Sequence, residues 1–326
     1  MKFEGPTNNK TLQFELWQQC NNHCDFCYLN KQNKHTDDSV KIESLKNALN
    51  TISNKEIVSQ YNCIGFIGGE FFQGQLSNPQ VKTLFFQLME KTAHLYNTNQ
   101  INQVWISATL NIGHQTELYQ TLDLFENHDR VWILTSWDTV GRFKSDKMLK
   151  TWEYHIENLH KTYPNLKINT TTILTGDLID RYNKGEFTFI QLSEKYNCTF
   201  FLKHCGSIVP WKTKGNFEEL RKVKQLSNEI VANFFPKRKS FLLFLSKFYA
   251  QEPEDMRTRM FNIQYRADNL IRSYNDGRIE QNVRLKNQKE EVRDLNHLEC
   301  GHPFVYSAYI DSDKCILCDK LWFENL

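Results

Sequence analysis

The chain has 326 residues and a formal net charge of +2 at pH 7, with 40% hydrophobic and 24% charged residues. This composition fits a globular protein, and the small net charge gives no support to a class that binds nucleic acid or anionic membranes. The first ten residues are polar, and no apolar stretch of about 18 residues occurs, so we expect no membrane partner and a cytoplasmic location.

Runs rich in β-branched and aromatic residues alternate with amphipathic stretches over residues 12–204. The runs predict strands at Leu12–Trp17, Cys63–Ile67, Val104–Leu110, Val131–Ser136, Ile168–Leu174 and Thr199–His204. The stretches predict helices at Ser39–Asn54, Pro79–Tyr96, Thr116–Phe125, Lys147–Thr162 and Phe187–Tyr196. This alternation predicts an α/β fold with a parallel sheet, either a partial (β/α)6 barrel or an open doubly wound sheet.

Three cysteines, Cys20, Cys24 and Cys27, follow the first predicted strand with the spacing C-x3-C-x2-C. The chain has nine cysteines, and this odd, clustered set favours metal binding in a reducing compartment over disulfide bonds. Three thiolates on one loop suit a [4Fe–4S] cluster with one iron left open, because cysteine thiolates hold such clusters. A zinc site with His23 as the fourth ligand is the alternative.

The triplet Gly68, Gly69 and Glu70 follows the second predicted strand directly. Glycine lets the backbone come close to a ligand, and a carboxylate beside it can take an ammonium group. In a barrel of parallel strands, the loops after the strands meet at one face, so the triplet should lie near the cysteine loop. An ordinary turn is the alternative interpretation.

The cysteine spacing, the aromatic Phe26 before the last cysteine and the Gly-Gly-Glu triplet resemble the signature elements of radical S-adenosylmethionine (SAM) enzymes. The resemblance covers Leu12 to about Cys205 and implies the partial (β/α)6 barrel. It also implies that the three cysteines hold a [4Fe–4S] cluster whose open iron is chelated by the amine and carboxylate of SAM. By the same resemblance, Gly68, Gly69 and Glu70 bind the SAM amino group, and the backbone at Phe26 meets the adenine.

Polar residues at the ends of later strands are further candidates for contacts with SAM. Ser136-Trp137-Asp138 ends the fourth predicted strand and resembles an element of radical SAM enzymes with SPASM-type C-terminal domains. There the serine lies near the ribose or carboxylate of SAM, whereas a helix N-cap is the alternative for Ser136 and Asp138. Ser107 ends the third strand, and alternation along a strand makes it a candidate to face SAM or substrate. Three residues share that expectation: Thr109, Asn169 and Thr171.

The pattern changes after Cys205, and we divide the chain into a core at 1–206, a charged helical extension at 207–299 and a metal-binding tail at 300–326. The extension is expected to begin with a helix at Phe217–Phe235, and Asn275-Asp276-Gly277 predicts a turn within it.

The tail carries Cys300, Cys315 and Cys318, of which the last two have metal-ligand spacing. The segment resembles the start of a SPASM or twitch domain, although Asp313 stands where that pattern usually has glycine. We expect one auxiliary [4Fe–4S] cluster, with Cys205 as a candidate remote ligand. A zinc site that includes His302 is the alternative.

The resemblance implies that SAM is cleaved reductively to a 5′-deoxyadenosyl radical, which abstracts hydrogen from a C–H bond. It implies oxygen sensitivity and a reducing partner such as flavodoxin or ferredoxin. SPASM-like tails favour a peptide or protein substrate, with a small molecule, a nucleoside or RNA as alternatives. A different class is also open, a non-catalytic iron–sulfur or zinc protein that binds nucleic acid. The Gly-Gly-Glu triplet argues against that class, because such a protein has no need of a site for the SAM amine.

Overall fold

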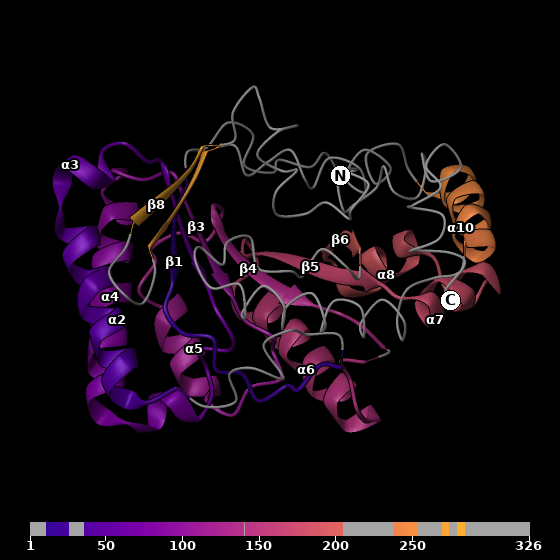
Figure 1. Ribbon diagram of the computed structural model, residues 1–326, viewed down its shortest axis with the longest axis horizontal. Coiled ribbons are helices and arrows are strands. Elements are labelled where there is room, and N and C mark those ends of the chain that lie inside the picture. Colours follow the sequence, from indigo (N-terminus) through magenta and orange to yellow (C-terminus); the bar gives the residue numbers. More distant parts are fainter. Residues whose placement is uncertain are drawn as a thin grey trace, which may run out of the picture.

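The computed structural model describes residues 11–25, 36–139, 141–204, 238–252, 269–273 and 279–283. They form an α/β fold around an eight-stranded sheet of order β6-β5-β4-β3-β2-β1-β7-β8 (Figure 1). The strands are β1 (Thr11–Glu15), β2 (Cys63–Ile67), β3 (Gln103–Ser107), β4 (Val131–Ser136), β5 (Lys167–Leu174), β6 (Thr199–His204), β7 (Asn269–Ser273) and β8 (Ile279–Val283). Strands β1 to β6 are parallel and alternate with helices, which confirms the predicted α/β class.

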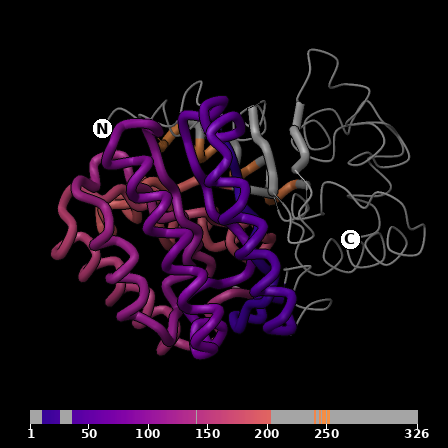
Figure 2. The backbone as a smooth tube through the Cα atoms, turned by 90° about the vertical axis from the view of Figure 1, so that its left-hand side faces the viewer, coloured from indigo at the N-terminus to yellow at the C-terminus, as the bar shows by residue number. Residues whose placement is uncertain are grey.

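The strand order bears on the two architectures left open by the sequence. Strands β1 to β6 follow one another across the sheet without a reversal, whereas a doubly wound sheet reverses its order at a switch point. Right-handed crossovers in such an order place the connecting helices on one face. Figure 2 shows the helices from indigo to magenta side by side on the face turned to the viewer. The order is compatible with a partial barrel.

Local signals explain where several helices begin. The helices are α2 (Asp38–Ser53), α3 (Lys55–Val58), α4 (Pro79–Asn97), α5 (Gln115–Leu122), α6 (Asp146–Thr162), α7 (Gly176–Asn183), α8 (Phe189–Tyr196) and α10 (Arg238–Gln251), with the short 3₁₀ helix η1 (Gly74–Ser77). Asn78 caps α4 by accepting hydrogen bonds from Gln80 N and Val81 N, and Ser145 caps α6. Among the described residues, no helix has the length and apolar character needed to cross a membrane.

Alternation along the strands separates a helix-covered face from a more polar one. The helix-covered face carries fully buried residues that share one core with side chains of α2 and α4: Leu12, Phe14, Ile64, Phe66, Val104 and Ile106. The rings of Phe14 and Phe66 stack with centroids 5.5 Å apart. Burial of this apolar row fixes the register, since a slip of one residue would turn every side chain to the other face.

The second face of the sheet carries a row in which Gln13, Gly65, Trp105 and Trp132 are neighbours in register. A Cβ atom on Gly65 would lie 2.1 Å from the Trp105 ring, so only glycine leaves room for that indole. Further along, the same alternation places Ser107, Leu134, Ser136 and Asn169 on this face. Polar groups here have no role in a helix-facing core, which leaves them to face a ligand or other parts of the chain.

Strands β7 and β8 correct the expectation of a helical extension at 207–299. β7 pairs in parallel with β1, and β8 pairs antiparallel with β7, so both belong to the sheet of the core. The helical expectation is wrong for these ten residues because pairing with the open edge of β1 sets their conformation, which their polar local sequence does not reveal. It is confirmed at α10. The expected helix at Phe217–Phe235 and the tail at 300–326 lie outside the described residues.

Candidate functional site

The cysteine loop, residues 16–25, leaves the end of β1 and runs along the end of β2. Leu16 N donates to Ile67 O at 3.4 Å, which extends the strand pairing by one step. Cys20 is partly buried and Cys24 is 5% exposed, whereas His23 between them is exposed and has a left-handed φ of 46°. The loop therefore turns sharply at His23 and sends Cys24 inward. Phe26 and Cys27 lie outside the described residues.

The Gly-Gly-Glu segment after β2 holds this loop through its backbone. Gly69 N donates to Trp17 O at 2.9 Å, and Glu70 N donates to Gln19 O at 3.0 Å. In return, the indole Nε1 of Trp17 donates to Glu70 O at 3.1 Å. These hydrogen bonds fix the path of residues 17–19 along the Gly-Gly-Glu segment, and we call this pairing the template contact.

Close approach explains why two glycines stand at this point. A Cβ on Gly68 would lie 2.2 Å from Trp17 O, and a Cβ on Gly69 would lie 2.0 Å from Gln19 O. Both distances fall on backbone atoms, which cannot swing away as a flexible side chain can. The triplet is therefore required by the path of the cysteine loop, whatever ligand is bound beside it.

The carboxylate of Glu70 is fully buried and joins the end of β2 to the end of β3. Its Oε1 accepts from Phe72 N at 3.0 Å, and its Oε2 accepts from Thr109 N at 2.5 Å and from the Thr109 hydroxyl. Burial raises the pKa of Glu70, while these hydrogen bonds oppose the rise. Both oxygens accept hydrogen bonds inside the protein, so the role that the structure shows for Glu70 is to hold the backbone at Phe72 and Thr109 in place.

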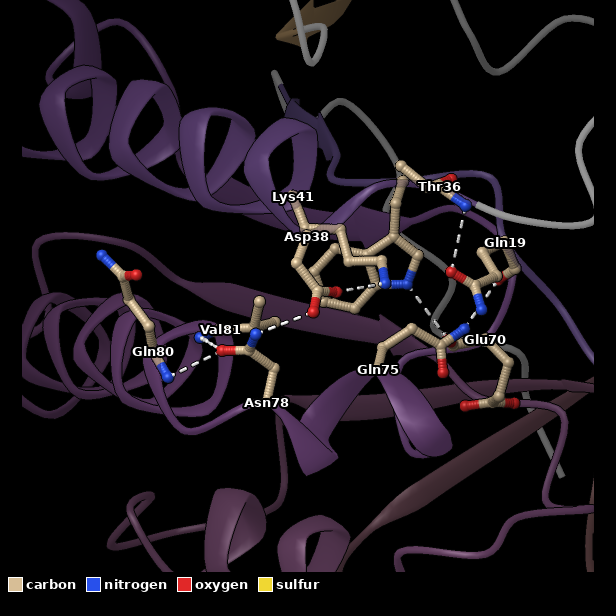
Figure 3. A network of polar contacts seen from close by, with 10 residues as sticks. Gln19, Thr36, Asp38, Lys41, Glu70, Gln75, Asn78, Gln80 and Val81 are labelled. Atoms are coloured by element: carbon tan, nitrogen blue, oxygen red, sulfur yellow. Dashed lines mark hydrogen bonds and ion pairs between the residues drawn. The ribbon is translucent and has the colours of Figure 1, made fainter.

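Gln19, Gln73 and Gln75 complete the support of the loop. Gln75 Nε2 donates to Gln19 O at 3.2 Å, and Gln19 Oε1 accepts from Thr36 N at 3.2 Å (Figure 3). Gln73 Oε1 accepts from Asn21 N at 3.0 Å. These glutamines were not singled out from the sequence. The signal for Gln73 and Gln75 is their polarity in a run that also holds Phe71, Phe72 and Leu76, and Gln19 has no comparable signal.

The segment after β4 holds the other end of the loop. Asp138, 2% exposed, accepts from Ile173 N at 2.6 Å and from Arg142 Nε at 2.6 Å, so it ties the segment to β5. Burial raises the pKa of Asp138 to about 6, and Arg142 opposes the shift. The same segment reaches the cysteine loop, because Gly141 O accepts from Asp25 N at 2.8 Å and Lys144 forms an ion pair with Asp25.

Ser107 and Ser136 are the last residues of β3 and β4, and both are partly buried on the polar face. The helix N-cap alternative does not apply to Ser136 or Asp138, because α6 begins later and is capped by Ser145. Two amide side chains of this face are buried and lack a hydrogen-bond partner among the described residues, at Gln13 Nε2 and Asn169 Oδ1. Together these groups can supply hydrogen bonds to a polar ligand.

The described residues contain no group of three metal-ligating side chains, and Cys20 and Cys24 are the two thiols of the loop among them. Cys27, Cys205, Cys300, Cys315 and Cys318 lie outside the described residues. Two amide donors beside the loop, Gln73 Nε2 and Asn22 Nδ2, are buried without an acceptor in the described part of the chain. Cysteine sulfurs and unused N–H donors on or beside one loop are chemically suited to an iron–sulfur cluster, whose ligands are thiolates and whose sulfurs accept such bonds.

Cys63 and Cys198 belong to the core and not to the site. Burial raises the pKa of each thiol to about 12, which favours the protonated thiol over the thiolate. Comparison with known proteins adds no assignment, since no family model and no curated protein matches the chain.

Proposed function

We propose that this protein is a radical SAM enzyme whose partial (β/α)6 barrel holds its cofactors at the carboxyl ends of the strands. The observation that supports this most is the template contact between the Gly-Gly-Glu segment and the cysteine loop. Two sequence motifs separated by about fifty positions meet there by paired backbone hydrogen bonds. An ordinary turn would not require both glycines to lie against the backbone of the loop that carries Cys20 and Cys24.

Cys20, Cys24 and Cys27 would hold a [4Fe–4S] cluster with one open iron. When bound and reduced, this cluster supplies one electron to SAM, which gives methionine and a 5′-deoxyadenosyl radical able to abstract hydrogen from a C–H bond. The loop keeps Cys24 buried and anchors Asp25 to the segment after β4, so the protein fixes the ligands and limits water access.

SAM would lie across the strand ends beside the loop. Because the Glu70 carboxylate is engaged with Thr109 and Phe72, we propose that the backbone of Gly68 and Gly69 receives the SAM amino group. The backbone at Phe26 would meet the adenine. Ser107 and Ser136, together with the amides of Gln13 and Asn169, would face SAM or the substrate on the polar side of the sheet.

The substrate that we favour is a peptide or protein, with a small molecule, a nucleoside or RNA as the second candidate. Cys300, Cys315 and Cys318 would hold an auxiliary [4Fe–4S] cluster or zinc, and a reducing protein such as flavodoxin or ferredoxin would deliver the electron. The clustered cysteines support a cytoplasmic, oxygen-sensitive enzyme.

The test is anaerobic reconstitution with iron and sulfide, followed by dithionite and SAM. We expect 5′-deoxyadenosine to form with the wild type and not with the Cys24→Ala variant. His23→Asn, which keeps a residue suited to the left-handed backbone, should bind as much iron as the wild type, whereas a zinc site built on His23 would be lost. An intact cluster without 5′-deoxyadenosine would refute the enzyme and leave a non-catalytic metal protein.

A further inference from the structure

Two side-chain amides, one within the cysteine loop and one beside it, have donors without acceptors among the described residues. Gln73 is 2% exposed and Asn22 is 4% exposed, and neither Gln73 Nε2 nor Asn22 Nδ2 has a hydrogen-bond partner among the described residues. Buried polar groups in proteins are almost always paired, so two such donors at one loop indicate an acceptor that the described part of the chain does not supply.

The orientation of the Gln73 amide is fixed by its other atom. Its Oε1 accepts from Asn21 N at 3.0 Å, which leaves Nε2 as the second end of the same planar group. Asn21 directly follows Cys20, and Asn22 lies between Cys20 and Cys24. One spare donor therefore lies within the stretch of chain between the first two cysteines, and the other belongs to a residue that is hydrogen-bonded to that stretch.

Gln75 shows that an unused donor is not a general feature of this segment. It is as buried as Gln73, at 2% exposed, yet its Nε2 donates to Gln19 O at 3.2 Å. The two glutamines of this segment thus differ, because one donor reaches a backbone carbonyl and the other has no acceptor among the described residues. Thiolate and sulfide sulfurs of a cluster are acceptors that suit such a donor.

We propose that Gln73 and Asn22 are positioning residues that donate hydrogen bonds to the sulfurs of the cluster held by the cysteine loop. This inference rests on the proposed function. A donor on a cluster sulfur withdraws electron density and stabilises the reduced state, so the two amides raise the reduction potential of the cluster. Gln73 also fixes the loop through Asn21, which couples the position of the ligands to the potential.

The experiment is a redox titration of the reconstituted full-length protein, with iron content measured on each sample. Gln73→Glu keeps the acceptor for Asn21 N and loses the donor, and Gln75→Glu adds the same charge on the same buried segment as the matched control. Asn22→Leu removes the other donor without adding charge. A tenfold weaker preference for the reduced state appears as a shift of about 59 mV in a one-electron couple.

We expect Gln73→Glu to have a more negative potential than Gln75→Glu, and Asn22→Leu a more negative potential than the wild type, at equal iron content. Equal potentials in both comparisons would overturn the inference, while 5′-deoxyadenosine formation by the wild type would leave the proposed function standing. If Gln73→Glu fails to hold iron, Asn22→Leu alone decides. A wild type that binds no iron would overturn both proposals.

Discussion

At the scale of single residues, the carboxylates of Glu70 and Asp138 make hydrogen bonds that stabilise the fold and that their sequence motifs did not predict. Glu70 was expected to meet an ammonium group, yet both of its oxygens accept hydrogen bonds from the strand ends. Asp138 was expected near SAM, and it ties the segment after β4 to β5 and Arg142. Such residues hold the backbone of the loop and of the strand ends in place.

Asp138 leads to a prediction about pH. Burial raises its folded-state pKa from the ordinary 3.8 to about 6, so folding favours the protonated form. Its contribution to the unfolding free energy is fully present below the unfolded pKa and is lost as the pH rises through the folded pKa. The loss is roughly 3 kcal/mol, since one pKa unit corresponds to about 1.4 kcal/mol.

The measurement is urea unfolding of the wild type and of Asp138→Asn, which does not titrate, at several pH values. We expect the wild type to lose stability relative to the variant between about pH 4 and pH 7. Parallel stability curves over that interval would show that Arg142 holds the carboxylate ionised throughout.

At the scale of elements, the sequence pattern predicted the bounds of three strands of the sheet. β2, β4 and β6 have the predicted bounds, because their apolar and β-branched residues are buried within the sheet. The sequence pattern missed α7, which has eight residues, begins with Gly176 and ends at a turn with Gly185. It also missed β7 and β8, which pair with each other and, through β7, with β1. The positions of Cys20, Gly68 and Gly69 at one edge were predictable, whereas the partners of Glu70 and Gln73 required the tertiary fold.

The template contact between the Gly-Gly-Glu segment and the cysteine loop makes a prediction at this scale. Gly69→Ala would place a Cβ 2.0 Å from Gln19 O and push the loop away. Overpacking of this kind costs about 1–3 kcal/mol, which a core of this size can tolerate. We expect the variant to keep its far-ultraviolet circular dichroism and to lose most of its iron after reconstitution.

Gly74→Ala is the matched control, because no atom lies within 4 Å of the Cβ that it would add. It should bind as much iron as the wild type. If Gly69→Ala also retains full iron, the two glycines do not set the path of the loop, and the template interpretation is wrong.

At the scale of the whole molecule, segments after residue 204 pack on both ends of the sheet. β7 and β8 extend it beyond β1, and α10 packs against α7 with Phe244 and Phe248 fully buried (Figure 1). Glu252, directly after α10, accepts from Tyr182 OH at 3.0 Å, Phe189 N at 2.8 Å and Ile190 N at 3.0 Å. The described parts of 207–299 are thus integrated with the core.

The hydrogen bonds of Glu252 lead to a prediction about how much they stabilise the packing of α10 against α7 and α8. Glu252→Leu leaves two buried donors and one partly buried donor without an acceptor, so we expect a loss of at least about 1–3 kcal/mol in the unfolding free energy, the cost of one such buried group. Hydrogen exchange should become faster in α10 and in the first turn of α8, which Glu252 holds. The exposed neighbour Gln251, replaced by Ala, is the control and should change neither. Unchanged exchange in Glu252→Leu would mean that the Phe244 and Phe248 contacts alone attach the helix.

The central claim is that the cysteine loop leaves one iron open for SAM, with His23 outside the cluster. Electron–nuclear double resonance on the reduced protein with SAM labelled with ¹⁵N at its amine measures this directly. We predict a ¹⁵N coupling that shows the SAM amine bound to iron, unchanged in His23→Asn. A cluster that gives no ¹⁵N coupling, or that shows a histidine nitrogen coupling lost in His23→Asn, would contradict the account.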